Sequence, residues 1–203
     1  MMLEAREVSY RYRNHPWLLQ HVNLQIHPGE VVGLYGKSGA GKTTLATILA
    51  GLKQPKQGFI QIDGHSYPME GFHPVQLVWQ LPEKVVNPKW RMKKILTEAG
   101  PLDSDLLAML GINKTWLNRY PSELSGGELQ RFCLARALGP KTKYLIADEM
   151  TTMLDAITQA QIWHTILELV QQRNIGILAI SHDPSLLERV CDRVINFDTL
   201  HSV

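Results

Sequence analysis

The chain has 203 residues, of which 44% are hydrophobic and 20% charged, and its formal net charge is +2 at pH 7. These values suit one domain with a sizeable core, and they exclude a disordered tail or a strongly basic nucleic-acid binder. Cys133 and Cys191 lie far apart without CxxC or histidine spacing, which argues against a zinc site or a disulfide scaffold and favours a reduced, cytosolic chain. No apolar run approaches the roughly 20 residues that cross a bilayer, and the N-terminus lacks the apolar core of a signal peptide.

The first third of the chain predicts strands that form one β layer, because apolar residues alternate along it. The expected elements are, in order, strands over residues 3–12 and 18–26, a Pro28-Gly29 turn, a strand over 31–35, a strand over 59–62 and an Asp63-Gly64 turn. A helix is expected to begin near Thr44, after a glycine-rich loop.

The rest of the chain alternates between strands and helices, as a parallel sheet demands. After a strand over residues 75–80, prolines interrupt the pattern and the composition turns helical. The stretch from Leu81 to Glu123 is a candidate helical insertion, and we place the inserted subdomain at about residues 81–128 of a single domain, 1–203. The remaining expected elements are helices over 92–99 and 106–110 (capped by Asp103 or Asp105), a helix over 129–138, a strand over 144–147, a helix over 157–172, a strand over 176–180, a helix over 185–190 and a strand over 193–197.

A glycine-rich loop over residues 36–43 predicts a phosphate site between the strand that ends at Tyr35 and the following helix. Its glycines let the backbone curl so that N–H groups point at phosphate oxygens, and the helix adds its positive N-terminal end. Lys42 supplies a point charge for the terminal phosphates, and Thr43 offers a hydroxyl to a magnesium ion. The nucleotide-binding residues predicted here are Gly36, Lys37, Ser38, Gly39, Ala40, Gly41, Lys42, Thr43 and Thr44.

A second motif, Leu124-Ser125-Gly126-Gly127-Glu128, stands at the start of another helix and leads into Gln130-Arg131. A serine hydroxyl and bare glycine N–H groups at a helix start make a second anion site, and two phosphate sites in one chain favour a dimer. This segment resembles the signature sequence of the ATP-binding cassette (ABC) ATPases. The resemblance implies that Ser125, Gly126, Gly127 and Glu128 close over ATP held by the phosphate loop of a second cassette.

Two carboxylates, Asp148 and Glu149, end an apolar strand. Asp148 stands at the carboxyl end of a strand beside the phosphate loop. We expect it to bind a magnesium ion through the water molecules of the ion's coordination shell, since magnesium keeps most of its waters. Glu149 resembles the catalytic glutamate of the family, which polarises the water that attacks the γ-phosphate.

Four further positions match the family one at a time. Gln80 resembles the glutamine that touches the metal and the lytic water, and His182 resembles the switch histidine that contacts the γ-phosphate. Tyr12 lies where the family stacks an aromatic ring on adenine, with Tyr10 as its competitor. Asp155 fits the loop that reaches across the dimer.

The chain departs from the family where many cassettes have proline and a small residue, since Met150 and Met153 stand there. We expect these flexible side chains to fill gaps at the dimer contact without metal binding, and we expect hydrolysis to survive. Three softer stretches, 85–89, 119–123 and 154–161, resemble the ATPases of importers for peptides and nickel.

The resemblance implies an α/β fold: the P-loop NTPase cassette, with a parallel core sheet, an N-terminal antiparallel β layer and an inserted α-helical subdomain. It also implies an ATP-hydrolysing subunit of an importer for nickel, another transition metal or di- and oligopeptides, with ATP and Mg²⁺ as cofactors. The expected partners are membrane permease subunits, a second ABC ATPase and indirectly a substrate-binding protein. The second ATPase is identical to this chain or different from it, and we favour a different one because importers of this group often have two ATPases. The expected location is the cytoplasmic face of the cell membrane, with no nucleic acid bound.

Two alternatives share part of this pattern. A soluble ABC protein of DNA repair or translation has the same motifs, but such proteins usually carry a long coiled coil or two joined cassettes, and neither occurs in these 203 residues. A nucleotide or small-molecule kinase would explain the phosphate loop, but it would leave residues 124–128 and His182 without a role.

Overall fold

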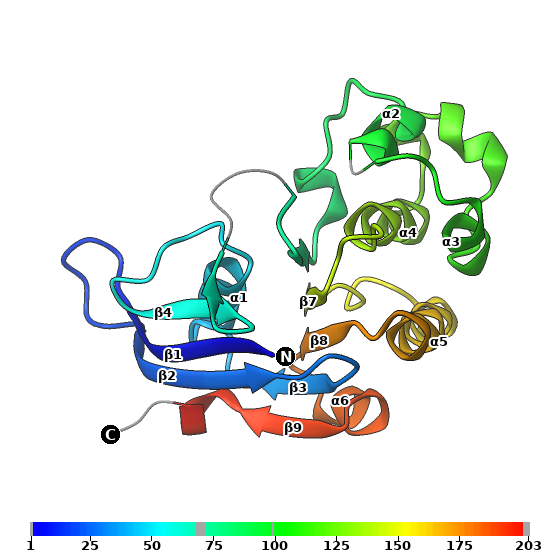
Figure 1. Cartoon of the computed structure of the whole chain (residues 1–203). Coiled ribbons are helices and arrows are strands. Elements are labelled where there is room, and N and C mark those ends of the chain that lie inside the picture. The colour runs from blue at the N-terminus through cyan, green and yellow to red at the C-terminus, as the bar shows by residue number, and fades with distance from the viewer. Residues whose placement is uncertain (1, 68–71, 99, 201–203) are drawn as a thin grey trace.

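The described part of the chain contains two β-sheets, one antiparallel and one parallel (Figure 1). The computed structural model describes residues 2–67, 72–98 and 100–200. One sheet has four antiparallel strands in the order β2-β1-β4-β5, and the other has five parallel strands in the order β6-β7-β8-β3-β9. The α/β architecture expected from the sequence, with a parallel core sheet and an antiparallel layer, is confirmed.

The elements follow one another along the chain with short connections. The strands are β1 (Leu3–Tyr10), β2 (Leu19–Ile26), β3 (Val31–Tyr35), β4 (Gln57–Ile62), β5 (His65–Ser66), β6 (Val75–Val78), β7 (Tyr144–Asp148), β8 (Gly176–Ile180) and β9 (Arg193–Asn196). The α-helices are α1 (Lys42–Leu49), α2 (Met92–Thr97), α3 (Ser104–Met109), α4 (Gly126–Ala137), α5 (Ala156–Arg173) and α6 (Pro184–Val190). Short 3-10 helices are η1 (Pro82–Lys84), η2 (Lys114–Asn118), η3 (Pro121–Glu123) and η4 (Phe197–Leu200).

The expectation that residues 31–35 belong to the same layer as the first two strands was wrong. Strand β3 lies in the parallel sheet, between β8 and β9. The reason is visible in the burial: β2 alternates between buried and exposed positions, whereas the first four residues of β3 are all buried. A short, continuously apolar strand needs cover on both faces, and only the parallel sheet provides it.

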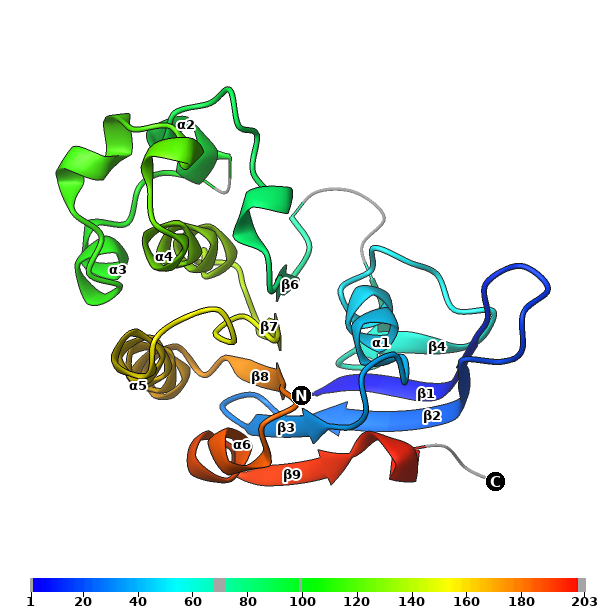
Figure 2. The same ribbon diagram turned by 180° about the vertical axis from the view of Figure 1, so that it is seen from behind.

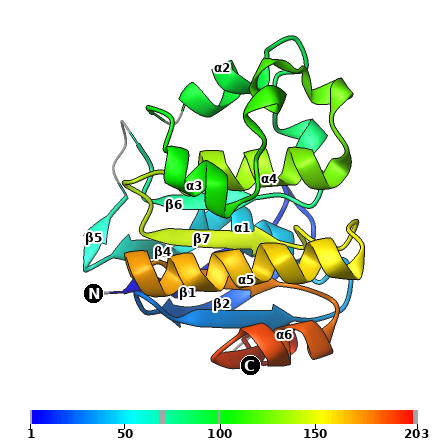
Figure 3. The same cartoon turned by 90° about the vertical axis from the view of Figure 1, so that its right-hand side faces the viewer.

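The parallel sheet separates two hydrophobic cores. Alternate side chains of its strands, such as Leu34 and Ile146, pack with α1 and the antiparallel sheet. The intervening side chains, such as Leu145 and Ile177, pack with α4 and α5. Figure 3 shows α5 lying lengthwise across this second face. Because both faces are covered, the carboxyl edges of β3 and β7 are held in a fixed relation to each other.

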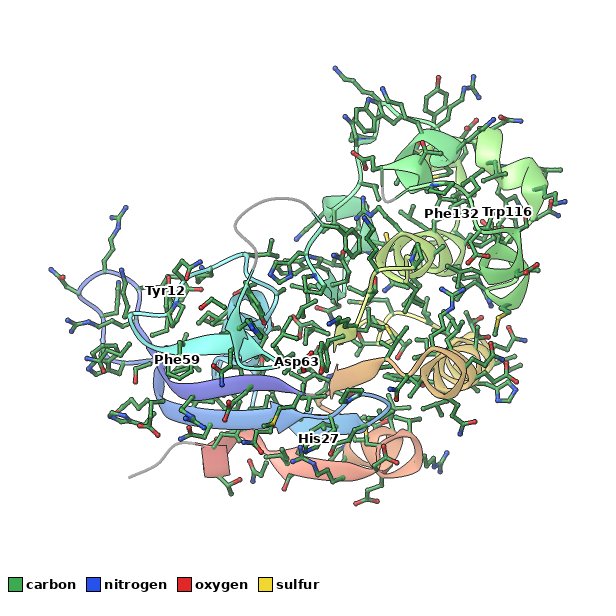
Figure 4. All side chains as sticks on the ribbon, in the orientation of Figure 1. Tyr12, His27, Phe59, Asp63, Trp116 and Phe132 are labelled. Atoms are coloured by element: carbon green, nitrogen blue, oxygen red, sulfur yellow. The ribbon has the colours of Figure 1, made fainter. Side chains whose placement is uncertain are left out.

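Helices α2, α3 and α4 gather on the side of the molecule away from α1 and the antiparallel sheet (Figures 1 and 2). Phe132 of α4 lies inside this group and Trp116 of η2 packs at its side (Figure 4). Asp103, rather than Asp105, caps α3, since its carboxylate accepts from the N–H groups of Asp105 and Leu106. The expected helix over 92–99 ends at Thr97 in the structure, and residue 99 lies outside the described residues.

Several boundaries differ from the expected ones where side-chain capping or loop geometry decides them. Helix α4 begins at Gly126, three residues earlier than predicted, because Ser125 and Glu128 form a reciprocal capping box. The strands expected over 3–12 and 75–80 end at Tyr10 and Val78. Tyr12 and Gln80 therefore lie in loops, just beyond the strands that lead to them.

Both cysteines are free, and both are shielded. Burial raises the pKa of the Cys133 thiol to about 11 and that of Cys191 to about 12. Since the thiolate is the reactive form, neither thiol is activated at neutral pH. Within the described residues, none of the helices combines the length and apolarity needed to span a bilayer.

The buried ring of Phe132 gives a direct test of the helical core. Phe132 is 0% exposed in α4, and Phe132→Ala should lower the free energy of unfolding by about 3–5 kcal/mol because it leaves a cavity. Urea unfolding followed by circular dichroism measures this loss. Ser122→Ala, at an exposed position of the same region, should change stability by less than about 0.5 kcal/mol. Equal midpoints for the two variants would contradict the placement of α4.

Candidate active site

The glycine-rich loop joins β3 to α1 in a conformation that requires glycine at two positions. Gly39 and Gly41 have φ values of 79° and 118°, a region that side-chain-bearing residues rarely adopt. A Cβ atom on Gly41 would also lie 3.1 Å from the side chain of Leu18. The loop is therefore free to curl tightly against the start of α1, as an anion cradle needs.

Lys42 is the buried cation of this loop, and its side chain folds back over the loop. Its residue is only 6% exposed, and Nζ donates hydrogen bonds to the carbonyl oxygens of Gly36 at 2.7 Å and Lys37 at 2.9 Å. These carbonyls hold the ammonium group beside the loop. A phosphate group entering the cradle would meet a positive charge that is already in place.

A cavity of about 250 Å³ opens over the loop. It brings together the phosphate loop, the loop after β6 and the end of β7, which are far apart in the sequence. Its lining residues are Leu18, Ser38, Gly39, Gly41, Lys42, Thr43, Thr44, Gln80, Asp148 and Glu149. Of these, Leu18 belongs to no motif, and only its place at the start of an expected strand marks it in the sequence.

Asp148 ends β7 and is 4% exposed. Its Oδ1 atom has no hydrogen-bond partner among the described residues. Burial raises the pKa of Asp148 and the adjacent Glu149 raises it further, while a hydrogen bond with Thr43 and the charge of Lys42 oppose the shift. A buried carboxylate with an unpaired oxygen is costly unless a cation or a donor compensates it.

Glu149 has a strained backbone, with φ at 50° in the left-handed region. Its N–H donates to the carbonyl of Ile180 at 3.0 Å, which ties it to the end of β8. Its Oε2 lies 3.5 Å from Nδ1 of His182, the residue that follows β8 by two positions. Such conformations persist only where the surroundings hold them, and they cluster at functional sites.

Gln80 is held by a residue that sequence reasoning did not single out. Its Nε2 donates to Oγ1 of Thr152 at 3.1 Å, and the Thr152 hydroxyl donates to the carbonyl oxygen of Glu149 at 2.9 Å. Thr152 lies in the loop between Glu149 and Asp155, where no motif marks it. A contact between residues 72 positions apart leaves no local signal in the sequence.

Tyr12, labelled in Figure 4, lies close to the first turn of α1, the helix that follows the phosphate loop. Its hydroxyl is 3.2 Å from Oγ1 of Thr44, and Nζ of Lys53 lies 4.6 Å from its ring centroid. Tyr12 is 45% exposed, whereas Tyr10 is buried at 9% and packs edge-on against Tyr12, with centroids 5.1 Å apart. Of the two candidate rings, only Tyr12 has an open surface for a base.

The signature residues are not among those that line the cavity. Ser125 and Gly126 are exposed at the start of α4, which stands apart from α1 in Figure 1. Ser125 Oγ accepts from the N–H of Glu128 at 3.3 Å, and Glu128 accepts from the N–H of Ser125 at 2.7 Å. The second predicted anion site therefore lies outside the cavity that contains the first one.

The segment after Glu149 runs close to the signature. A Cβ atom on Gly127 would lie 3.4 Å from Thr158 and 3.5 Å from Leu154. Asp155 caps α5 by accepting from the N–H groups of Ile157 and Thr158. Met150 is buried at 3%, but Met153 is 69% exposed and Ile157 is 72% exposed.

Known proteins of one family resemble this chain. A profile of the ABC transporter family matches residues 19–152, more than half of the chain. The nickel import ATP-binding protein NikE of Shigella boydii serotype 4 (strain Sb227) is 37% identical over 91% of this chain and 76% of its own length. The protein of the same name from Escherichia coli O157:H7 is 34% identical over 97% of this chain and 84% of its own length.

Two solved structures share the fold. A dimeric ATP-binding cassette, MJ0796, in a post-hydrolysis state bound to ADP and Pi, superposes with a TM-score of 0.82 at 24% identity, over 96% of this chain and 93% of that one. The protein cbiO1 of Clostridium perfringens, part of the transporter complex cbiONQ, gives a TM-score of 0.80 at 24% identity, over 96% of this chain and 83% of that one.

The fold and the phosphate loop define an ATP-binding cassette, the domain type that binds and hydrolyses ATP. The chain belongs to the ABC transporter family, as the family profile and the relatives above 30% identity show. It is an ATPase subunit of that family, as the signature sequence predicted.

The ammonium group of Lys42 provides the first test of the site. Lys42→Ala should abolish ATP binding in isothermal titration calorimetry, because it removes the charge that faces the phosphates. The fold should persist, as judged by an unchanged far-UV spectrum. Lys56→Ala removes an exposed lysine elsewhere and should bind ATP as the wild type does. Undiminished binding by the Lys42 variant would refute the assignment of this loop.

Proposed function

We propose that this chain is the ATP-hydrolysing subunit of an importer, in which two cassettes share each nucleotide. The chain would act as a single domain over residues 1–203, with residues 81–128 as the inserted helical subdomain. The observation that carries the proposal is the separation of the two anion sites. The cavity over the phosphate loop contains Lys42 and Asp148, while Ser125 lies exposed at the start of α4, outside that cavity.

A head-to-tail pair of cassettes resolves this separation. In such a pair, Ser125, Gly126, Gly127 and Glu128 of one subunit face the nucleotide on the loop of the other. The hydrogen bond between Ser125 and Glu128 uses the Ser125 oxygen as acceptor and not its proton, so the hydroxyl proton would be available to donate to a phosphate. The exposed apolar side chains of Met153 and Ile157 lie in the segment beside the signature, and burying them against a partner is favourable.

Within each site the chain would bind ATP through residues 36–44 and Tyr12. The backbone N–H groups of the loop and Lys42 would hold the phosphates, and the open face of Tyr12 would stack on the adenine ring. The hydrogen bond between Tyr12 and Thr44 supports this role, because it fixes the ring against the helix that follows the loop.

Hydrolysis would depend on Glu149, His182 and Gln80. Glu149 would accept the proton of a water whose oxygen attacks the γ-phosphorus, while the bond to the β-phosphate oxygen breaks and ADP leaves. His182 would contact the γ-phosphate, and its position 3.5 Å from Glu149 supports a shared site. Gln80, which lines the cavity together with Glu149, would orient the same water.

The oxygen donors at the cavity fit a magnesium ion. Asp148 Oδ1 is buried without a hydrogen-bond partner among the described residues, and Thr43 and Gln80 line the same cavity. This is the hard oxygen set that magnesium takes, with water completing its shell. When bound, the ion would neutralise charge on the β- and γ-phosphates; Thr43, Gln80 and Asp148 would hold it.

The partners and cargo follow from the family and from the relatives' names. The chain would attach to permease subunits at the cytoplasmic face of the membrane, pair with a second ABC ATPase and serve a substrate-binding protein indirectly. Both NikE relatives are named for nickel import, so nickel is the cargo we favour over other transition metals and peptides. Closure on ATP would transmit movement to the permease beside Gln80 and the helical subdomain.

Glu149→Gln tests the shared site. This variant should retain ATP but lose at least about a hundredfold in turnover, since it lacks the proton acceptor. It should therefore accumulate as an ATP-dependent dimer in size-exclusion chromatography with light scattering, either alone or with its partner ATPase. ADP in place of ATP should leave it monomeric. A variant that stays monomeric with ATP and both cassettes present would contradict the proposal.

Co-purification tests the transport role. Tagged protein expressed with the neighbouring membrane genes should retain permease subunits in mild detergent, and deletion of the gene should lower uptake of radioactive nickel. A soluble ABC protein of repair or translation would retain no permease. Unchanged nickel uptake with intact permease binding would leave the importer standing and shift its cargo to peptides or another metal.

A further inference from the structure

Thr152 occupies the junction between Gln80 and Glu149. We infer that Thr152 is a positioning residue, which orients the side-chain amide of Gln80 so that its oxygen, not its nitrogen, faces the nucleotide cavity. The inference rests on the proposed role of Gln80 at the metal. It assigns to one hydroxyl a function that the motifs do not show.

The direction of each hydrogen bond follows from which of the two groups carries a proton. The carbonyl oxygen of Glu149 has no proton and only accepts, so the Thr152 hydroxyl, 2.9 Å away, uses its single proton on that bond. The oxygen of Thr152 is then left as an acceptor. Gln80 approaches this oxygen at 3.1 Å, and only its NH₂ group is able to donate there.

These bonds determine which way the amide oxygen of Gln80 faces. When Nε2 of Gln80 is committed to Thr152, the side chain presents Oε1 as its remaining polar atom, and Gln80 lines the cavity with Asp148. Magnesium takes oxygen ligands, so the presented atom is the useful one. A flipped amide would turn an N–H donor toward the cation and repel it.

The turn that contains Thr152 is held by hydrogen bonds to Glu149 and to helix α5, so the position of the Thr152 hydroxyl is fixed. The N–H of Thr152 also donates to the carbonyl of Glu149, at 3.2 Å. The preceding residue, Thr151, is 3% exposed and its Oγ1 accepts from Gln159 at 2.9 Å and from Trp163 at 3.2 Å. Helix α5 therefore anchors the turn, and the bond to Gln80 extends that anchor to the loop after β6.

Thr152→Val and Thr152→Ser form a matched pair for the test. Valine keeps the shape and removes the hydroxyl, whereas serine keeps the hydroxyl and removes a methyl group. Mn²⁺, used as a paramagnetic substitute for Mg²⁺, would be titrated by electron paramagnetic resonance in the presence of a non-hydrolysable ATP analogue. We expect Thr152→Val to weaken Mn²⁺ binding about three- to tenfold, in line with the loss of one orienting hydrogen bond, and Thr152→Ser to bind as the wild type does.

A double-variant comparison separates orientation from general damage. Gln80→Ala should weaken Mn²⁺ binding by itself, and adding Thr152→Val to it should cause no further loss, because there is no amide left to orient. A second readout needs no metal: the side-chain amide protons of Gln80, followed by NMR in the nucleotide-free protein, should exchange faster in Thr152→Val than in the wild type or Thr152→Ser.

The outcomes distinguish the inference from the proposal beneath it. If Gln80→Ala weakens Mn²⁺ binding and Thr152→Val leaves it unchanged, orientation by Thr152 is wrong and the proposed metal role of Gln80 stands. Additive losses in the double variant would also refute orientation. If Gln80→Ala leaves Mn²⁺ binding unchanged, the metal role of Gln80 fails and the inference falls with it. Should Thr152→Val fold poorly, Thr152→Ala with Thr152→Ser as its control gives the same decision.

Discussion

The structure depends on holding several charged groups around a cavity of about 250 Å³ at one edge of a parallel sheet. Lys42 is kept near the loop carbonyls of Gly36 and Lys37, and Asp148 is buried at the end of β7 with an unpaired oxygen. Burying the Asp148 carboxylate is costly, because a buried charge needs a counter-charge, and the nearby charge of Lys42 offsets part of that cost. Two hydrophobic cores, one on each face of the sheet, hold these groups in place and offset the free-energy cost of burying them. The strained Glu149 depends on the same support.

In the proposed dimer, one chain alone does not complete the nucleotide site. The phosphate loop and the carboxylates share a cavity, while Ser125 lies outside it at the exposed start of α4. The segment from Glu149 to Asp155 links the two regions: Thr152 contacts Gln80, and Leu154 lies next to Gly127. A movement of the helical region relative to the sheets would therefore alter the cavity and the signature together. This coupling is what an ATPase that drives another protein requires.

Much of this could be predicted from the sequence because the determinants are local. The phosphate loop needs glycines at fixed spacing, and the carboxylates follow an apolar strand directly, so Gly41, Lys42 and Asp148 were identifiable without coordinates. The sheet to which β3 belongs could not be predicted, because a short apolar run does not specify which distant strands it pairs with. Thr152 and Lys53 could not be predicted for a similar reason. Their roles depend on contacts with Gln80 and Tyr12 that form only in the folded chain.

The central claim is that each nucleotide is enclosed by two cassettes. A crystal or cryo-EM structure of the Glu149→Gln variant with ATP, together with its partner cassette, measures this directly. The account predicts that Ser125 and Gly127 of one subunit contact the γ-phosphate held by Lys42 of the other. A nucleotide bound with Ser125 of every neighbouring subunit facing solvent would contradict it.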